Sequence, residues 1–377
     1  MRCGSAGIGA PGHIQCIWSF FSRCCDRGSG GSATNSADDT DTGYIRLRYA
    51  GVMKNILRQT LLVLLIVGFA FPAWGCPNVV EEVRPVPAAA EGELALATFN
   101  LWDLMAHGRD GAHVSEAALA ERLPVTGRWI VEVLGAPELI AVQEVESLAV
   151  LERLASAIVD AGGPSYRAIV RTGNDSSGIN SGLLVGEAVE IGKTTLLFAD
   201  QAHGRHWLYD RPPLRVEVLT PLRFDLLVVH LRSGHGLDDP SRRDWVKRKR
   251  QAQADKLRRW MVAERLAGRR PVIVGDLNSA PDAGVFSSPF GTLSQPPWQS
   301  VWRWIDEPDR FSYIHRCQRQ AIDHILLPPG LVEKVGRAAV TRGNAGRYRP
   351  LYGERGTGEV VSDHDALVVF FRLTPDA

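Results

Sequence analysis

The sequence has little net charge, few cysteines and no visible internal repeat. Lys and Arg number 43 and Asp and Glu number 42 in 377 residues, so no bulk basic field demands a nucleic-acid partner. Any binding of a polyanion must therefore come from local patches. Of the six cysteines, only Cys76 and Cys317 lie beyond residue 52, and these two could pair in an oxidising compartment.

Long apolar runs are also scarce. Residues 61–71 form an almost wholly apolar run, which is shorter than the roughly 20 residues that a membrane-spanning helix needs. A short basic segment precedes this run, and Ala73-Trp74-Gly75 ends it with small residues at cleavage-type positions. This is the three-part plan of a secretory signal peptide. We therefore expect export, either secretion or transfer to the periplasm, rather than a transmembrane anchor.

The ends of this segment suggest the organisation of the chain. We interpret residues 53–76 as the signal peptide and Met53 as the true start, with residues 1–52 an upstream over-extension; a disordered leader is the alternative. Cys76 follows the cleavage point in AWGC, similar to a bacterial lipoprotein box although Ala73 and Trp74 are atypical there. Membrane anchoring through a lipidated Cys76 is thus an alternative to a disulfide. Residues 77–93, rich in Pro, Ala and Glu, read as an exposed linker, and 94–377 as one domain.

Strands outnumber helices along that domain, and several connections are short. Helices are predicted over 115–134, with a break or kink at Pro124, and over 147–161 and 240–266. Apolar runs predict strands at 94–99, 139–142, 166–171, 181–185, 190–198, 215–219, 224–231, 272–274, 321–327 and 366–371. This pattern indicates a layered α/β sandwich.

Polar side chains punctuate the ends of these strands. In PVIVGDLNSAP, residues 271–281, Asp276 and Asn278 follow a β-branched run two residues apart and project to the same side. Taken alone, this stretch could be a strand followed by an Asx-type turn. Similar positions are held by Asn100, Glu144, His230, Asp323 and the Ser362-Asp363-His364 cluster. Six such positions in one chain disfavour the interpretation that all are satisfied loop residues.

These stretches together resemble the endonuclease/exonuclease/phosphatase superfamily, which includes deoxyribonuclease I and the AP endonucleases. The resemblance rests on TFNL, LIAVQEVE, VVHLRSG, VIVGDLNS, AIDHIL and VVSDHDAL, in this order, over about residues 94–373. The sequence looks most similar to bacterial secreted members. The resemblance implies a four-layer α/β sandwich of two packed, mostly antiparallel β-sheets with helices outside. It also implies metal-dependent hydrolysis of phosphoesters.

The resemblance assigns metal binding to Glu144, with Asn100 and Asp363 beside it. The expected ion is Mg²⁺ or Mn²⁺, with Ca²⁺ as a further option, because hard cations take carboxylate oxygens and substrate phosphate as ligands. Such an ion would neutralise charge on the scissile phosphate and stabilise the leaving oxygen. Asn100 would hydrogen-bond to metal ligands or to phosphate.

The remaining family positions fall on the catalytic candidates. Asp276 would orient or deprotonate the attacking water, and Asn278 would donate to the developing phosphorane. Asp323 and His364 resemble the pair in which a carboxylate fixes the imidazole tautomer. His230 resembles the second histidine, directed at a phosphate oxygen or the leaving group. His324 also follows an Asp but lies inside a strand, so we interpret it as structural.

Several basic residues are candidates for phosphate contacts. Arg232, Arg171 and Asn174 are predicted to bind substrate, with solvated loop residues as an equal alternative. Deoxyribonuclease I has an Arg shortly after its metal glutamate, whereas this chain has Val145-Glu146, so its mode of groove binding is in doubt here. The basic run 242–260 is interpreted as the solvated face of a helix away from the site. The stretch 206–211 is a better candidate for substrate contact because it lies in a connection.

Three functions follow as hypotheses. The first is an exported metal-dependent nuclease that acts on DNA or RNA, expected to be an endonuclease and a monomer with no obligate protein partner. The second is a phosphodiesterase or phosphatase acting on lipid headgroups or small phosphoesters, for which membrane contact could come from the region of Trp298, Trp302 and Trp304. The third is a non-catalytic module that retains the fold, which the complete polar set argues against.

Overall fold

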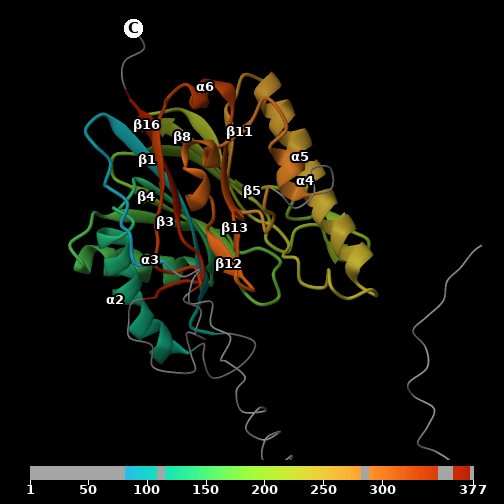
Figure 1. Cartoon of the computed structure of the whole chain (residues 1–377), viewed down its shortest axis with the longest axis horizontal. Coiled ribbons are helices and arrows are strands. Elements are labelled where there is room, and N and C mark those ends of the chain that lie inside the picture. The colour runs from blue at the N-terminus through green and yellow to red at the C-terminus, as the bar shows by residue number, and fades with distance from the viewer. Residues whose placement is uncertain (1–80, 108–114, 282–287, 347–359, 374–377) are drawn as a thin grey trace, which may run out of the picture. The chain divides into compact units, whose positions relative to one another are not determined.

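Two six-stranded β-sheets pack face to face in the protein (Figure 1). The computed structural model describes residues 81–107, 115–281, 288–346 and 360–373, all within one unit, Gly75–Ala377. Across the first sheet the strands are β15 (Val335–Val340), β16 (Leu367–Arg372), β1 (Glu93–Leu104), β2 (Leu139–Val145), β4 (Asn180–Gly186) and β3 (Tyr166–Val170). Across the second they are β11 (Gln299–Ser300), β14 (Asp323–Leu327), β10 (Pro271–Asp276), β9 (Phe224–His230), β8 (Leu214–Thr220) and β5 (Glu190–Leu196).

Both sheets are mostly antiparallel. Among the described strand pairs, only β1 with β2 and β9 with β10 are parallel. Two small ribbons stand apart from the sheets: β6 (Ala202–His203) pairs with β7 (His206–Trp207), and β12 (Tyr313–His315) with β13 (Gln318–Gln320). The predicted fold class, a sandwich of two mostly antiparallel sheets with helices outside, is confirmed.

Alternation of side chains along the strands produces the layers. In β1, Leu94 and Leu96 point into the space between the sheets, whereas Ala95 and Ala97 face the helices outside the first sheet. Successive residues of a strand project to opposite faces, so a strand covered on both faces must be apolar at nearly every position. This is why the central strands read as continuous apolar runs rather than as alternating patterns.

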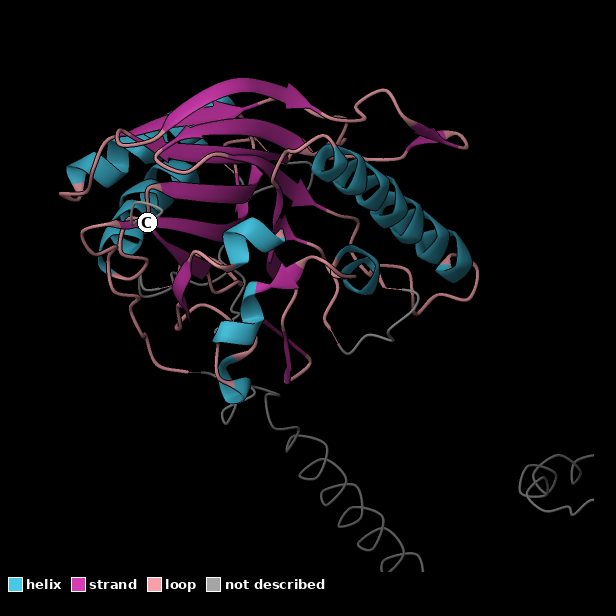
Figure 2. Ribbon diagram, turned by 90° about the horizontal axis from the view of Figure 1, so that it is seen from above, coloured by secondary structure: helices cyan, strands magenta, loops and turns pink. Residues whose placement is uncertain are grey.

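Helices cover the outer face of each sheet (Figure 2). The first sheet is covered by α2 (Glu116–Glu132) and α3 (Leu148–Asp160), whose N-termini are capped by the hydroxyls of Ser115 and Ser147. The second sheet is covered by α4 (Arg243–Leu266) and the short α5 (Pro289–Leu293). The remaining short helices are α6 (Pro329–Val332) and the 3₁₀ turns η1 (Val301–Trp304) and η2 (Glu307–Asp309).

The helix predicted over 115–134 does not break at Pro124, which lies inside α2 on its exposed face, where water can satisfy the carbonyl that the proline leaves unbonded. Most described residues of the stretch predicted to be a linker are exposed. Two contacts connect this stretch to the domain: Val86 is buried, and the backbone of Arg84 pairs with that of Arg342.

The predicted signal peptide and Cys76 lie outside the described residues. In the part of the chain that is described, no helix has both the length and the apolar character to cross a membrane. Cys317 is disulfide-bonded and is the only cysteine after residue 80, so its partner also lies outside the described residues. Pairing with Cys76 therefore stays a prediction.

Candidate active site

The strand topology brings the predicted polar residues to one edge of the sandwich. The parallel strands β1 and β2 carry Asn100 and Glu144 near their carboxyl ends at this edge, and β9 and β10 end there at His230 and Asp276. The antiparallel strand β14 begins at the same edge. Asp276 is consequently the register partner of both His230 and Asp323.

Asn100 links the two sheets at this edge. Its Nδ2 donates to Glu144 Oε1 at 3.2 Å and to Asp276 Oδ2 at 3.3 Å, across the gap between the sheets. Its Oδ1 accepts from the backbone N–H of Trp102 at 2.9 Å. Of its predicted roles, the structure therefore supports hydrogen bonding to the carboxylates, while the oxygen that would ligate a metal already accepts a bond.

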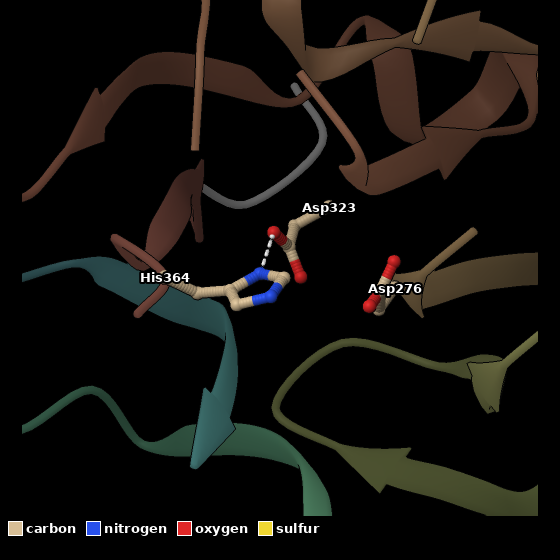
Figure 3. Close-up of side chains that lie close together, drawn as sticks. All are labelled: Asp276, Asp323 and His364. Atoms are coloured by element: carbon tan, nitrogen blue, oxygen red, sulfur yellow. Dashed lines mark hydrogen bonds and ion pairs between the residues drawn. The ribbon is translucent and has the colours of Figure 1, made fainter. Parts of the chain in front are cut away.

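His364 and Asp323 form a second link between the sheets (Figure 3). The Nδ1 of His364 lies 2.7 Å from Asp323 Oδ2, and the buried Ser312 donates its hydroxyl to the same oxygen at 2.6 Å. Burial alone would lower the pKa of His364. The carboxylates of Asp323 and Asp363 outweigh burial, and the pKa of His364 is raised well above its usual value. His364 is thus the charged histidine of the site.

Loop contacts fix where His364 lies. Ser362 donates its hydroxyl to the carbonyl of Asn100 at 2.6 Å and accepts from the backbone N–H of His364 at 3.0 Å. The ring of Tyr313 lies over the imidazole with centroids 4.8 Å apart. Three residues therefore position His364: Ser362, which is bonded to Asn100 of β1, Tyr313 of β12, and Asp323.

Carboxylates crowd the same edge with little neutralising charge. Burial, followed by repulsion from Asp103 and Asp363, raises the pKa of Glu144 to about 7. Burial and repulsion from Asp323 raise the pKa of Asp276 to about 7. A divalent cation with oxygen ligands would relieve both effects, so this donor set fits the hard metal ion that the family resemblance implies.

One grouping of described side chains has the spacing to hold such an ion. Ligand atoms of Asp276, Asp323 and His364 all lie within 4.8 Å of one another. The short contact between Asp323 and His364 already occupies one atom of each, however. The predicted metal ligands Glu144 and Asp363 line the same pocket.

His230 differs from His364 in charge. It is buried, and its Nε2 lies 3.7 Å from Glu144 Oε1 and 3.6 Å from Asp276 Oδ2, too far for hydrogen bonds. Burial, Arg211 and His364 lower its pKa well below the usual value. Its buried Nδ1 has no hydrogen-bond partner among the described residues. Nε2, on the side of the two carboxylates, is thus the ring nitrogen that His230 turns toward them in the pocket that it lines.

The backbone around the site is unusual. Trp102, Asp103, Glu144 and Asn278 all have positive φ values, of 43°, 46°, 62° and 51°. Gly275, with φ 133°, precedes Asp276, and a Cβ there would lie 2.0 Å from the carbonyl oxygen of Val229. Only glycine allows β9 and β10 to approach this closely. Uncommon backbone conformations gather where side chains must be held in fixed positions.

The clustered side chains line an open pocket of about 240 Å³. Its lining combines Glu144, His230, Asp276, Asn278, Asp363 and His364 with Arg211, Ser233, Tyr313 and Ile322. A larger hollow of about 540 Å³ lies along β3, β4 and β5, where it is lined by residues such as Tyr166 and Glu190. We take the smaller pocket as the candidate active site because the histidines and carboxylates converge there.

Not every predicted site residue reaches this pocket. The guanidinium of Arg171 is exposed and donates to Thr194 in β5, so Arg171 does not line the pocket. The amide of Asn174 donates to the carbonyls of Ala199 and Tyr209, which stabilises a loop. Both side chains already have partners in the protein, and neither lines the site.

Asn278 lies in the pocket but with a different task from the predicted one. Its Nδ2 donates to the carbonyl of Leu231 at 3.0 Å and to Asp276 Oδ2 at 3.2 Å. Both amide hydrogens are thereby used within the protein, which leaves none for a phosphorane oxygen. In this conformation Asn278 positions Asp276. The predicted structural role of His324 agrees with its burial in β14 and its contact with the carbonyl of Ser279 at 2.8 Å.

Arg211 belongs to the stretch 206–211, which was predicted as a candidate for substrate contact from its basic and aromatic composition. It lines the pocket, pairs with Asp175 at 2.9 Å and donates to the carbonyls of His230 and Leu231. Two further residues near the site were not predicted. Tyr313 and Asp103 had no comparable signal, because one belongs to a three-residue strand and the other lies beyond the predicted end of β1.

The interpretation of α4 as a helix remote from the site was wrong. Lys249, Arg250 and Gln253 are buried on its inner face. Arg250 donates to the carbonyls of Arg232 and of Asn278, and Gln253 accepts from the N–H of Arg232 and donates to the carbonyl of Leu208. This side of α4 therefore anchors the loops that carry His230, Asp276 and Arg211. Amphipathic periodicity did not reveal it because charged residues were assumed to face solvent.

Solved structures share this fold at low sequence identity. An endonuclease/exonuclease/phosphatase from Bacteroides vulgatus is 14% identical, with TM-score 0.51, covering 75% of this chain and 99% of that one. D. rerio TDP2 complexed with a single-strand DNA product is 16% identical, with TM-score 0.51, covering 74% and 99%. The human Nocturnin catalytic domain with bound sulfate is 13% identical, with TM-score 0.50, covering 77% and 96%. No curated protein matches the chain by sequence.

A family profile covers most of the domain and all of the clustered residues. The profile described as Endonuclease/Exonuclease/phosphatase family matches residues 97–364, from within β1 to His364 itself. Because this match spans more than half of the chain, the protein belongs to the endonuclease/exonuclease/phosphatase family, whose members are generally phosphoester hydrolases.

Proposed function

We propose that this protein is a metal-dependent nuclease that hydrolyses phosphodiester bonds of nucleic acid. The observation that supports this proposal most directly is the convergence of Glu144, Asp276, His230 and the Asp323–His364 pair on one pocket. The single-strand DNA product bound to D. rerio TDP2 favours nucleic acid among the phosphoesters. Glu144 with Asp363 would hold the metal, for which we propose Mg²⁺ or Mn²⁺.

Each side chain has a role in the proposed in-line attack of water. A water oxygen bonds to phosphorus while the bond to the leaving sugar oxygen breaks, and Asp276 takes the proton of the water. A pKa of about 7 suits Asp276 for this because a base works best near the operating pH. The bound metal would supply charge stabilisation to the phosphate and the leaving oxygen.

The two histidines act on the phosphate in different charge states. His364 is held charged by Asp323, so its Nε2–H can donate to an anionic phosphate oxygen as negative charge develops. The neutral His230 turns its Nε2 toward Glu144 and Asp276 in the same pocket. The leaving oxygen takes its proton from solvent.

Action on lipid headgroups receives less support. The tryptophans that could have contacted a membrane are core residues: Trp298 and Trp302 are buried, and their indole N–H groups donate to the carbonyls of Pro271 and Asp323. Export of the protein and lipidation of Cys76 remain proposals from the sequence. A reporter fusion that begins at Met53 tests export, and failure of that fusion to be exported would contradict it.

The test of the proposed function is release of acid-soluble nucleotides from DNA and from RNA by the purified protein. We expect release with Mg²⁺ or Mn²⁺, none with EDTA, and loss of release in His364→Ala. The control is Arg265→Ala, an exposed position at the far end of α4. Absence of release, with metal-dependent hydrolysis of a generic phosphodiester still lost in His364→Ala, would keep the site and reject nucleic acid as its substrate.

A further inference from the structure

A strip of aromatic and cationic side chains lies beside the pocket. It consists of Arg232, Trp245, His206 and Trp207, which come from the loop after β9, from α4 and from the β6–β7 ribbon. The guanidinium of Arg232 lies over the indole of Trp245 at 5.1 Å, and the ring of His206 meets the edge of that indole at 5.3 Å. Ser233, next to Arg232, lines the pocket. The strip is thus continuous from the pocket wall to the ribbon.

The charge of the strip is not fully neutralised. Among the described residues, Arg211 pairs with Asp175 at 2.9 Å and Lys249 with Asp210 at 2.7 Å. By contrast, no described carboxylate lies within 4.0 Å of the Arg232 guanidinium, whose closest polar contact is the carbonyl of His235 at 3.4 Å. Arg232 is therefore a half-buried cation with room for an external anion.

Charges of both signs surround Arg232. Burial is the main reason that its pKa is lowered; Arg242 and Arg211 add to the lowering, whereas Asp210 and Asp175 oppose it. These two carboxylates are themselves paired with Lys249 and Arg211. An anion bound beside Arg232 would therefore give it the direct partner that no described carboxylate supplies.

The outer end of the strip presents an aromatic face to solvent. Trp207 is the most exposed tryptophan in the described part of the chain, at 45%, and His206 beside it is also exposed. Both belong to a two-residue strand that takes no part in either large sheet. Single exposed apolar residues are common on proteins. Trp207 is singled out here because the other residues of the strip, including Trp245 and Arg232, lead from it to the pocket.

We propose that the strip binds single-stranded nucleic acid and leads it into the active-site pocket. Bases stack on Trp207 and on the exposed part of the His206–Trp245 pair, and phosphates lie against Arg232. Aromatic side chains that alternate with cations are typical of surfaces that bind single strands, because every unpaired base has a face to stack. A duplex would hide those faces, and one exposed indole is too little apolar surface for a lipid bilayer. This inference rests on the proposed nuclease function.

The first test is binding of a fluorescent single-stranded oligonucleotide, measured by anisotropy in the non-cleaving His364→Ala background. Adding Trp207→Ala should weaken binding roughly 5- to 150-fold, the range that corresponds to one stacked base. A duplex of the same sequence should lose much less. The matched control is Leu266→Ala, which removes a side chain that is 77% exposed on α4.

A second variant tests the charge of the strip. Arg232→Ala should lower the salt dependence of single-strand binding by about 0.7 in the slope of log K against log salt, the value for one phosphate contact. Arg265→Ala, which also removes one arginine, should leave the slope unchanged. Arg232→Lys should restore most of the slope but less of the affinity, because lysine keeps the charge without the planar group that stacks on Trp245.

Three results would overturn the inference. They are binding by the Trp207→Ala protein that equals the Leu266→Ala control, an equal loss of single-strand and duplex binding, and a Trp207→Ala effect on anionic phospholipid vesicles alone. If the protein releases nucleotides from DNA or RNA yet one of these results is found, the strip is rejected and the nuclease function stands. If it releases none and binds none, both fall together.

Discussion

The two helical layers of the sandwich cover their sheets with different chemistry. On the first sheet, α2 and α3 bury almost only apolar side chains, such as Leu119, Ile130, Leu151 and Leu154. On the second sheet, α4 buries Leu257 and Met261 together with the polar Lys249, Arg250 and Gln253. The first layer thus anchors backbone beside the site through one half-buried residue, Arg122 of α2, whereas α4 does so through several buried polar residues.

The difference follows from what lies beneath each layer. Beneath α2, the end of β1 leaves the carbonyls of Leu101, Trp102 and Asp103, and the half-buried Arg122 is the residue of α2 that donates to them. The loops after β9 and β10 leave backbone carbonyls beneath α4, and buried carbonyls need donors. Arg250 supplies them to the carbonyls of Arg232 and Asn278. The two layers should consequently respond differently to mutation.

The largest expected effect is on the rate of phosphodiester hydrolysis at the site between the two layers. Asp276→Asn should lower phosphodiester hydrolysis by roughly 10²- to 10⁴-fold, because a general base is removed. In EDTA the same variant should be more stable than the parent at pH 8. The pKa of Asp276 in the folded protein is raised to about 7, so the contribution of its protonated form to the free energy of unfolding is lost as pH rises through 7. The neutral amide in Asp276→Asn avoids that loss. Kinetic assays and denaturant unfolding at pH 8 check both parts; reduced stability at pH 8 would contradict the second.

A truncation in the apolar layer should act on stability. Leu154→Ala removes a fully buried side chain between α3 and the first sheet and should cost about 2–5 kcal/mol in the free energy of unfolding. Activity per folded molecule should remain that of the parent, since Leu154 packs among apolar residues and does not line the pocket. Urea unfolding measures the first quantity, and activity at a temperature where the variant is folded measures the second. If kcat fell strongly while the free energy of unfolding stayed normal, the predicted difference between the two helical layers would be wrong.

The buried His324 gives the second sheet a pH dependence of its own. Burial is the main reason that its pKa is lowered to about 4, although the contact with Ser279 opposes this. A histidine with a depressed folded pKa stabilises the native state above its unfolded pKa of about 6.5 and loses that contribution as pH falls through 4. The loss amounts to about 3 kcal/mol at most, from 1.4 kcal/mol per pKa unit.

The comparison protein for this prediction is His324→Gln, which retains a donor for the carbonyl of Ser279. Between pH 7 and pH 4 the difference in unfolding free energy between the parent and the variant should shift against the parent. Using the difference cancels the opposite contributions of Glu144 and Asp276, which are present in both proteins. A difference that stays constant over this range would show that His324 does not titrate as inferred.

The smallest effect concerns the polar face of α4. Arg250→Met leaves the carbonyls of Arg232 and Asn278 without their donor, at a cost of about 1–3 kcal/mol in stability. Activity should fall about 10- to 100-fold, the range typical of residues that do not bind the metal themselves but position the residues that do. Arg250→Lys should recover part of the activity. Arg259→Met, an exposed change on the same helix, is the control and should alter neither quantity.

Much of the catalytic set could be predicted because it lies at strand ends. Asn100, Glu144, His230, Asp276, Asp323 and His364 each adjoin a strongly apolar run, and apolar runs are the part of a sequence that secondary-structure reasoning locates best. Parallel pairing of β1 with β2 and of β9 with β10 then brings their ends together. Short elements such as β12, which carries Tyr313, contain too few residues to show a period.

The predictions that failed concern what side chains contact across the fold. Arg171 and Asn174 were predicted to contact phosphate because they lie in or beside a loop. Their side chains instead donate hydrogen bonds to Thr194, Ala199 and Tyr209. Arg250 stood in a basic run and is buried. A charged residue in a helix can face water or a buried carbonyl with the same local pattern, so periodicity alone does not distinguish them.

The sequence by itself determined the sandwich of two sheets, the family and most of the polar residues at its edge, because strand patterns and strand-end motifs are local. Only the tertiary structure decided which residues act together: that Asn100 joins two carboxylates across the sheets, that Asn278 holds Asp276, that Arg211 lines the pocket and that α4 supports the site. The bond between Asn100 and Asp276 joins residues 176 positions apart. Their hydrogen bonds and charges depend on distances that arise only when both sheets have closed.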